Sequence, residues 1–327
     1  MCTLILGLEV LGPNTLLVGA NRDESPGRPS EGPGLLRETP RVAGGRDLLA
    51  GGTWLAVREA RFVAALMNRR PTPEDSRDPA ALRSRGLLCI ETAASEAPPE
   101  PTAPAPLPGR SFLDAALLSF ERHAYGHCTL VGVGTDGEAW AIHGGNGTAA
   151  PRVQPIPRGW HVVTHADLDD RSEPRTRALL DALGDRIPAS VDAAIERLAS
   201  LLRRHAEEGV PPVCLHRESF PTVSSRILVL GYVGNVSSAC MSVLIATNST
   251  PWRLEAIILF TAFPPAPPTP TTFIFAFCPL TSSISNIVAP SFLYFYLKIS
   301  LTQSFILPKT PVKASEEKVL PGSEPYP

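Results

Sequence analysis

The chain has 327 residues and a formal net charge of −2, with 30 lysines and arginines against 32 aspartates and glutamates. The chain therefore has no excess of basic residues that would attract nucleic acid, and we expect no nucleic-acid partner. The six cysteines form no CxxC pair, which is typical of reduced thiols and indicates a cytoplasmic protein rather than a disulfide framework.

Two apolar runs at the N-terminus predict a β-hairpin. Residues 3–10 and 15–20 are mostly apolar or β-branched, and a Gly-Pro-Asn turn separates them. The second run ends in charged residues, among them Arg22 and Asp23. If the strands pair antiparallel, these charges lie beside Cys2.

Cys2 has a chemical use at this position. Removal of Met1 would leave Cys2 with a free α-amino group, whose pKa of ~8 lets it accept the thiol proton. A neighbouring Arg22 would favour the thiolate. The alternative is a small apolar residue at the start of a buried strand, a common place for free cysteine.

Several ordered motifs resemble those of the NRDE family. They are MCTLIL at the N-terminus, ANRDE at 20–24, GGTW at 51–54, SRG at 84–86 and TVSS at 222–225. This family is the transport and Golgi organisation protein 2 group of the N-terminal-nucleophile (Ntn) hydrolases. The resemblance covers about residues 1–230 and implies an α+β fold, a four-layer αββα sandwich. It also implies hydrolysis of a carbon–nitrogen amide bond.

The segment after the hairpin combines loops with a second strand pair. Residues 25–40 and 43–52 are rich in Gly, Pro or charge, which predicts loops, while 53–57 and 61–67 read as strands. Asn68 ends the second strand. The family resemblance implies that it binds the developing oxyanion, and the alternative is a turn residue that caps the strand.

The middle of the chain predicts two helices and a further hairpin. Apolar residues recur at helical spacing over 80–94 and 111–123, and Asp78 precedes the first as an N-cap. Residues 127–133 and 138–143 alternate as strands around a Thr-Asp-Gly turn.

Two sequence patterns resemble a metal site and a cofactor site, but the residues that flank them do not complete either motif. His123 and His127 are four residues apart, but Gly126 breaks the helix between them and no acidic or cysteine partner follows. The Gly-rich stretch at 144–147 is followed by Pro151 instead of a helix, so a dinucleotide site is not indicated. We therefore expect neither a metal nor a cofactor.

A strand over 160–164 leads to His165, which stands where many family members have asparagine. We consider it a substrate-side donor, and a structural histidine is the alternative. Further along, the sequence predicts helices at 175–183 and 191–205 and strands at 213–216 and 222–230.

The composition changes near residue 230. No lysine occurs before Lys298 and no arginine after Arg253, and the chain becomes rich in Ser, Thr, Ile and Phe. We therefore divide it into a domain at 1–230 and a tail at 231–327. The tail is either foreign sequence, a loosely packed or disordered extension, or a membrane segment. Membrane association would involve only residues 227–307, where 227–247 is uncharged and long enough for a helical span.

These observations predict an Ntn-type amide hydrolase of a small acylated substrate. The predicted catalytic residues are Cys2, Arg22, Asp23 and Asn68, and the predicted substrate-binding residues are Glu24, Trp54 and His165. The alternative is a non-catalytic carrier or trafficking protein on the same fold, because relatives are linked to Golgi organisation and to haem or lipid handling. In that case Cys2 and His165 would act as ligands.

Overall fold

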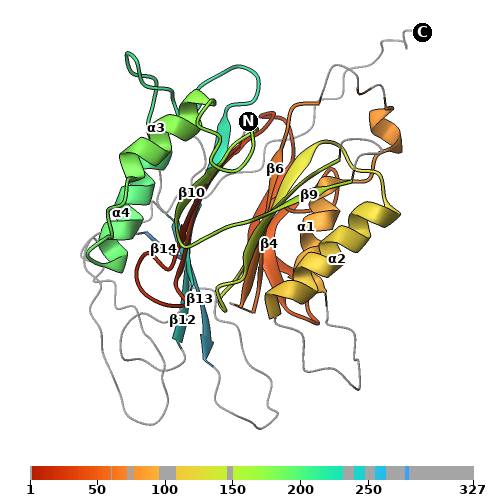
Figure 1. Ribbon diagram of the computed structural model, residues 1–327, viewed down its shortest axis with the longest axis horizontal. Coiled ribbons are helices and arrows are strands. Elements are labelled where there is room, and N and C mark those ends of the chain that lie inside the picture. Colours follow the sequence, from red (N-terminus) through yellow and green to blue (C-terminus); the bar gives the residue numbers. More distant parts are fainter. Residues whose placement is uncertain are drawn as a thin grey trace, which may run out of the picture.

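A computed structural model describes residues 2–59, 61–71, 75, 77–95, 108–145 and 150–230, together with three strands beyond them. Two β-sheets stack face to face, and a pair of helices covers the outer face of each (Figure 1). The predicted αββα sandwich is therefore confirmed.

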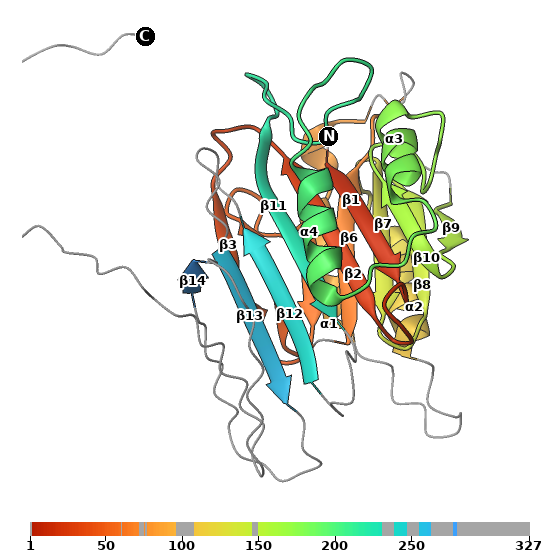
Figure 2. The same ribbon diagram turned by 90° about the vertical axis from the view of Figure 1, so that its left-hand side faces the viewer.

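The first sheet has the strand order β10-β1-β2-β11, and all its neighbours are antiparallel. Its strands are β1 (Thr3–Leu8), β2 (Leu16–Asp23), β10 (Gly159–Val163) and β11 (Thr222–Leu230). Strands β1 and β2 form the predicted N-terminal hairpin. Helices α3 (Pro174–Leu183) and α4 (Val191–Leu202) lie across its outer face (Figure 2).

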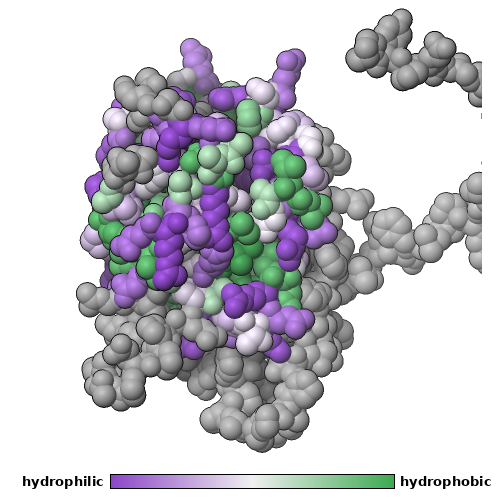
Figure 3. All heavy atoms as spheres, turned by 90° about the vertical axis from the view of Figure 1, so that its right-hand side faces the viewer, coloured by the Kyte–Doolittle hydropathy of each residue, from purple (hydrophilic) through white to green (hydrophobic). Residues whose placement is uncertain are grey.

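The second sheet runs in sequence order from β3 to β9. Its strands are β3 (Ser30–Arg37), β4 (Val42–Asp47), β5 (Leu55–Arg58), β6 (Phe62–Asn68), β7 (Cys128–Gly134), β8 (Ala139–Gly144) and β9 (Arg152–Pro155). Helices α1 (Arg85–Ala94) and α2 (Pro108–Arg122) cover its outer face, after a short 3-10 turn (Pro79–Ala81). Seen from that side, hydrophilic and apolar side chains are interspersed (Figure 3).

The N-terminal strands are apolar without alternation because both of their faces are covered. Leu4 and Leu6 point into the core between the sheets, whereas Ile5 packs against α3 and α4. Every residue of β1 and β2 is buried, including the charged end of β2. The two strands therefore carry the polar residues Asn21, Arg22 and Asp23 into the interior.

Some sequence predictions were wrong in detail. Strands β3 and β4 occupy the stretches expected to be loops, because an edge strand such as β3 is largely exposed and tolerates proline. The short strand expected at 213–216 is not formed. Helix α1 begins at Arg85 instead of residue 80, since the Asp78 cap serves the preceding 3-10 turn.

Three further strands follow the first sheet in sequence. Strands β12 (Ala239–Ala246), β13 (Glu255–Ala262) and β14 (Phe277–Pro279) form an antiparallel sheet, and β12 lies beside β11 (Figure 2). Residues 227–230 and 239–246 are thus strands, which corrects the helical span considered for 227–247. Among the described residues, no helix is both long and apolar enough to cross a membrane. The other interpretations of the tail lie outside the described residues.

Two glycines allow α1 to start directly against the second sheet. A Cβ atom on Gly52 would lie 2.3 Å from the carbonyl carbon of Gly86, and Thr53 N donates to Gly86 O at 3.1 Å. We expect Gly52→Ala to lower the free energy of unfolding by about 1–3 kcal/mol, because backbone atoms cannot move aside. Gly32→Ala, at a position with nothing within 4 Å, is the matched control. Equal effects of the two substitutions in denaturant unfolding would contradict this packing.

Candidate active site

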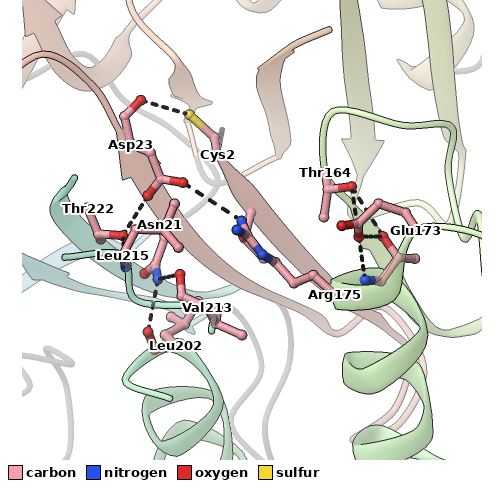
Figure 4. Close-up of polar contacts among 12 residues, drawn as sticks. Cys2, Asn21, Asp23, Thr164, Glu173, Arg175, Leu202, Val213, Leu215 and Thr222 are labelled. Atoms are coloured by element: carbon pink, nitrogen blue, oxygen red, sulfur yellow. Dashed lines mark hydrogen bonds and ion pairs between the residues drawn. The ribbon is translucent and has the colours of Figure 1, made fainter. Parts of the chain in front are cut away.

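The register of the first hairpin places Cys2 beside the charged end of β2. Thr3 pairs with Asn21, so Cys2, one residue before β1, lies next to Arg22 and Asp23. The Cys2 thiol donates to the main-chain oxygen of Asp23 at 3.8 Å (Figure 4). The predicted proximity of these three residues is therefore confirmed.

Asp23 lies in a buried polar cluster at the end of β2. The residue is only 4% exposed, and its side chain is fully buried. Thr222 Oγ1 donates to Asp23 Oδ1 at 2.6 Å, and Arg175 Nη1 lies 3.8 Å from Asp23 Oδ2 (Figure 4). Burial raises the pKa of Asp23, although Thr222 and Arg175 act in the opposite direction. Arg175 also donates to Thr3 Oγ1 at 3.1 Å, so it ties the start of β1 to the end of β2.

Asn21 has a different function from its charged neighbours. Its Nδ2 donates to Leu202 O at 2.9 Å and to Val213 O at 3.1 Å, and Ser225 Oγ donates to its Oδ1 at 2.6 Å. All of these groups are buried. Asn21 therefore fastens the segment after α4 to the back of the sheet (Figure 4).

The surroundings of Cys2 do not favour a thiolate. Burial raises the pKa of its thiol, and the neighbouring Asp23 raises it further. Arg22 lowers the pKa, as expected from the sequence, but its effect is smaller. Desolvation of the thiol thus outweighs the pKa-lowering effect of Arg22, which was expected to activate the sulfur. The sulfur needs a base to become a nucleophile.

Trp54 lies against two buried arginines. The guanidinium carbons of Arg22 and Arg226 are 4.4 Å and 4.2 Å from its ring centroid. Burial lowers the pKa of Arg226 to about 9, and the nearby Arg22 lowers it as well. Within the described part of the chain, Nε and Nη1 of Arg226 have no hydrogen-bond partner. The indole therefore contacts two closely spaced cations through its ring.

A cavity of about 670 Å³ opens beside Cys2. Of the predicted site residues, Cys2, Arg22, Glu24, Trp54 and Asn68 line it. Asn68 is exposed and is the last residue of β6, so it reaches the cavity from the second sheet, whereas Cys2 reaches it from the first. The structure thus gathers residues from both sheets around one space.

His165 does not line this cavity. It follows β10, which pairs with β1 on the side away from β2. Burial lowers the pKa of His165. The register of β1 with β10 sets Leu4 opposite Val163 and so brings His165 next to Cys2, on the side away from Arg22. His165 thus lies near the sulfur but outside the cavity that Glu24 and Trp54 line.

The cavity wall is rich in arginine. Six arginines and three carboxylates line it: Arg22, Arg28, Arg69, Arg77, Arg83 and Arg85 against Glu24, Asp47 and Asp75. Most of these arginines are paired. Arg28 binds Asp47 at 2.6 Å, Arg77 binds Asp75 at 2.7 Å, and Arg83 contacts Glu91.

Arg85 differs from its neighbours on the wall. It donates to the main-chain oxygen of His127 at 3.0 Å, and no ion pair joins it to a carboxylate of the described chain. It begins α1, within the SRG motif. Among the described residues, Arg85 is therefore a cation on the cavity wall that has no carboxylate partner.

Sequence reasoning missed Arg175, Thr222 and Arg226. The first lies in the first turn of α3 and the other two belong to β11, so they reach the site from elements more than 150 residues away in the chain. The TVSS motif was noted for its resemblance, but nothing in it indicated a hydrogen bond to Asp23.

Comparison with known proteins places the chain in context. A family model described as transport and Golgi organisation 2 matches residues 1–247. No curated protein matches the chain.

Among solved structures, the chain is similar to an N-acylethanolamine-hydrolyzing acid amidase ortholog from Caenorhabditis elegans, with 17% identity and a TM-score of 0.46. The match covers 69% of this chain and 92% of that one. Penicillin V acylase from Agrobacterium tumefaciens matches at 10% identity with a TM-score of 0.41, over 79% and 91% of the two chains. A variant of conjugated bile acid hydrolase from Clostridium perfringens matches at 10% identity with a TM-score of 0.41, over 81% and 97%.

The cavity residue Arg69 is held by a network that should respond to pH. Arg69 lies 2.6 Å from Asp167 and 3.1 Å from Nδ1 of His143, which also contacts Thr129 Oγ1 at 2.9 Å. Burial lowers the pKa of His143 to about 4, although Asp167 acts in the opposite direction. At pH values between the folded-state pKa of about 4 and the ordinary histidine pKa of about 6.5, His143 binds more protons in the unfolded chain than in the folded chain.

We therefore expect the His143 contribution to the free energy of unfolding to decrease as the pH falls from about 6.5 to about 4, by up to about 3 kcal/mol. Urea unfolding across this range, compared with His143→Asn, isolates the effect. The variant should show a shallower decrease than the wild type. The same slope in both proteins would contradict the assignment.

Proposed function

The chain belongs to the transport and Golgi organisation 2 family, and from the geometry at its N-terminus we propose that it is an N-terminal-cysteine amide hydrolase. The observation that carries this proposal is the position of the Cys2 thiol, 3.8 Å from the main-chain oxygen of Asp23 and on the wall of a 670 Å³ cavity. A protonated thiol there needs an adjacent base. The α-amino group released by removal of Met1 would be that base.

The proposed reaction uses one residue as both nucleophile and base. The α-amine of Cys2 takes the thiol proton, and the sulfur attacks the amide carbonyl carbon. The Asn68 side chain donates to the resulting oxyanion. Collapse breaks the carbon–nitrogen bond, and the α-ammonium group gives its proton to the leaving amine. Water then hydrolyses the thioester to a carboxylic acid and restores the thiol.

The buried charges beside Cys2 have positioning roles in this proposal. Asp23 is close enough to affect the thiol electrostatically, and Thr222 and Arg175 fix its carboxylate. Arg22 and Trp54 form the adjacent wall of the cavity, next to Glu24. These residues would orient the scissile amide against the sulfur.

The arginine-rich wall favours binding of a substrate that carries an anionic group. Five of the six arginines have a carboxylate partner within 4.0 Å, whereas Arg85 contacts a main-chain oxygen and no carboxylate of the described residues. A carboxylate on the substrate would form a charge-assisted hydrogen bond with Arg85. N-acylated amino acids combine such a carboxylate with an amide bond.

The direct test measures hydrolysis of a panel of N-acyl amino acids by the full chain. We expect Cys2→Ala to abolish turnover and Cys2→Ser to lower kcat by at least about 10³-fold, because the nucleophile is lost or weakened. Cys89→Ala, which removes a buried thiol in α1, is the matched control and should keep wild-type turnover. Turnover that survives Cys2→Ala, or a folded chain that hydrolyses no member of the panel, would contradict the proposal.

The anionic-substrate part has its own test. We expect Arg85→Ala to raise KM about 10- to 100-fold for an N-acyl amino acid, as one charge-assisted hydrogen bond is lost. The corresponding acylated amine without a carboxylate should be unaffected. Arg83→Ala, which removes a neighbouring arginine already paired with Glu91, should have a smaller effect. Equal losses on the charged and the neutral substrate would count against recognition of an anion.

A further inference from the structure

Three metal-binding side chains converge in the segment between α4 and β11. His205 follows the end of α4, and Cys214 and His216 lie shortly before β11. Their donor atoms all lie within 4.8 Å of one another. Nδ1 of His205 is 2.9 Å from Nε2 of His216, and the Cys214 sulfur is 3.9 Å from the same nitrogen.

These separations fit a common ion. With Zn–N distances of about 2.0–2.1 Å and a Zn–S distance of about 2.3 Å, tetrahedral geometry places two nitrogens about 3.3 Å apart and nitrogen and sulfur about 3.6 Å apart. The observed 2.9 Å and 3.9 Å from His216 Nε2 differ from these values by a few tenths of an ångström, and the third pair of donors, on Cys214 and His205, lies within 4.8 Å. Side-chain rotation of the exposed His205, which moves its donor nitrogen by about 1 Å toward the Cys214 sulfur, would therefore complete the coordination.

The donor types select the class of metal. One sulfur and two imidazole nitrogens suit a borderline-soft ion such as Zn²⁺, whereas Ca²⁺ and Mg²⁺ require oxygen ligands. In the described part of the chain, no carboxylate joins this group. The sulfur is buried and both histidines are exposed, so a fourth position would face solvent.

We propose that His205, Cys214 and His216 bind one Zn²⁺ ion, with water as the fourth ligand. This site is separate from the cavity beside Cys2, whose wall contains none of the three residues. The proposal does not depend on the hydrolase activity.

The position of the site gives the ion a structural function. Leu215, between two of the ligands, donates from its nitrogen to Thr222 Oγ1 at 2.9 Å and accepts from Thr222 N at 2.9 Å. Thr222 in turn donates to Asp23 (Figure 4). The ion would cross-link the end of α4 to the segment that fixes Asp23.

This proposed site departs from the sequence expectation of no metal, which considered His123 and His127 but not these three residues. The overlooked signal is a Cys-x-His pair with a histidine nine residues before it. That spacing matches no common zinc motif, because the fold and not the local sequence brings His205 into place.

The test is metal titration of the purified full chain, with any affinity tag removed. We expect one Zn²⁺ per chain, bound stoichiometrically at micromolar protein, and a rise in Tm of several °C on adding Zn²⁺ to the chelator-treated protein. Co²⁺ should bind in its place and give a thiolate-to-cobalt charge-transfer band. Cys214→Ser should abolish that band, and His205→Ala or His216→Ala should weaken Zn²⁺ binding at least tenfold.

Matched controls are Cys89→Ser and His123→Ala, which remove a thiol and an exposed histidine outside the site. Both should bind Zn²⁺ like the wild type. Absence of both stoichiometric binding and a Tm shift in the wild type would overturn the proposal without reliance on any variant. An unchanged charge-transfer band in folded Cys214→Ser would overturn the assignment of the ligands.

Discussion

The antiparallel pairing of β1 with β2 is the constraint on which the rest of the site depends. Leu4 and Leu6 point between the sheets while Ile5 packs against the helices, so both faces of β1 are buried. A slip of one residue would exchange these faces, and the packing on both sides therefore fixes the register. That register sets Thr3 opposite Asn21 and so brings Cys2 to the charged end of β2.

The charges gathered there are costly to the fold. Arg22, Asp23, Arg175 and Arg226 are each 4–6% exposed. Removing such ions from water costs several kcal/mol each, and Asp23 recovers only part of this through Thr222 and Arg175. Well-packed apolar residues would give a more stable interior. Here the buried charges lie beside a cavity and beside a thiol with a raised pKa. Such destabilising groups are characteristic of functional sites, where the residues needed for chemistry lower the stability of the fold.

The parts of the structure that follow from local pattern were predictable, and the long-range parts were not. The β1–β2 hairpin could be read from its apolar runs and turn, and with it the proximity of Cys2 to Asp23. The edge strand β3 escaped prediction because an exposed strand needs no apolar pattern. Arg175 and Thr222 were missed because tertiary packing alone brings them to Asp23. That His165 lies beside Cys2 but outside the cavity could not be predicted, because the sequence does not reveal that β10 pairs with β1 on the side away from β2.

The central claim is that the sulfur of Cys2 works with its own backbone nitrogen, and intact-mass analysis of the purified chain tests it most directly. The account predicts a protein that has lost Met1 and that gains a single acyl group from an electrophilic amide or lactone, with peptide mapping placing the group on Cys2. A chain that retains Met1 yet hydrolyses its substrate, or an adduct located on another residue, would contradict it.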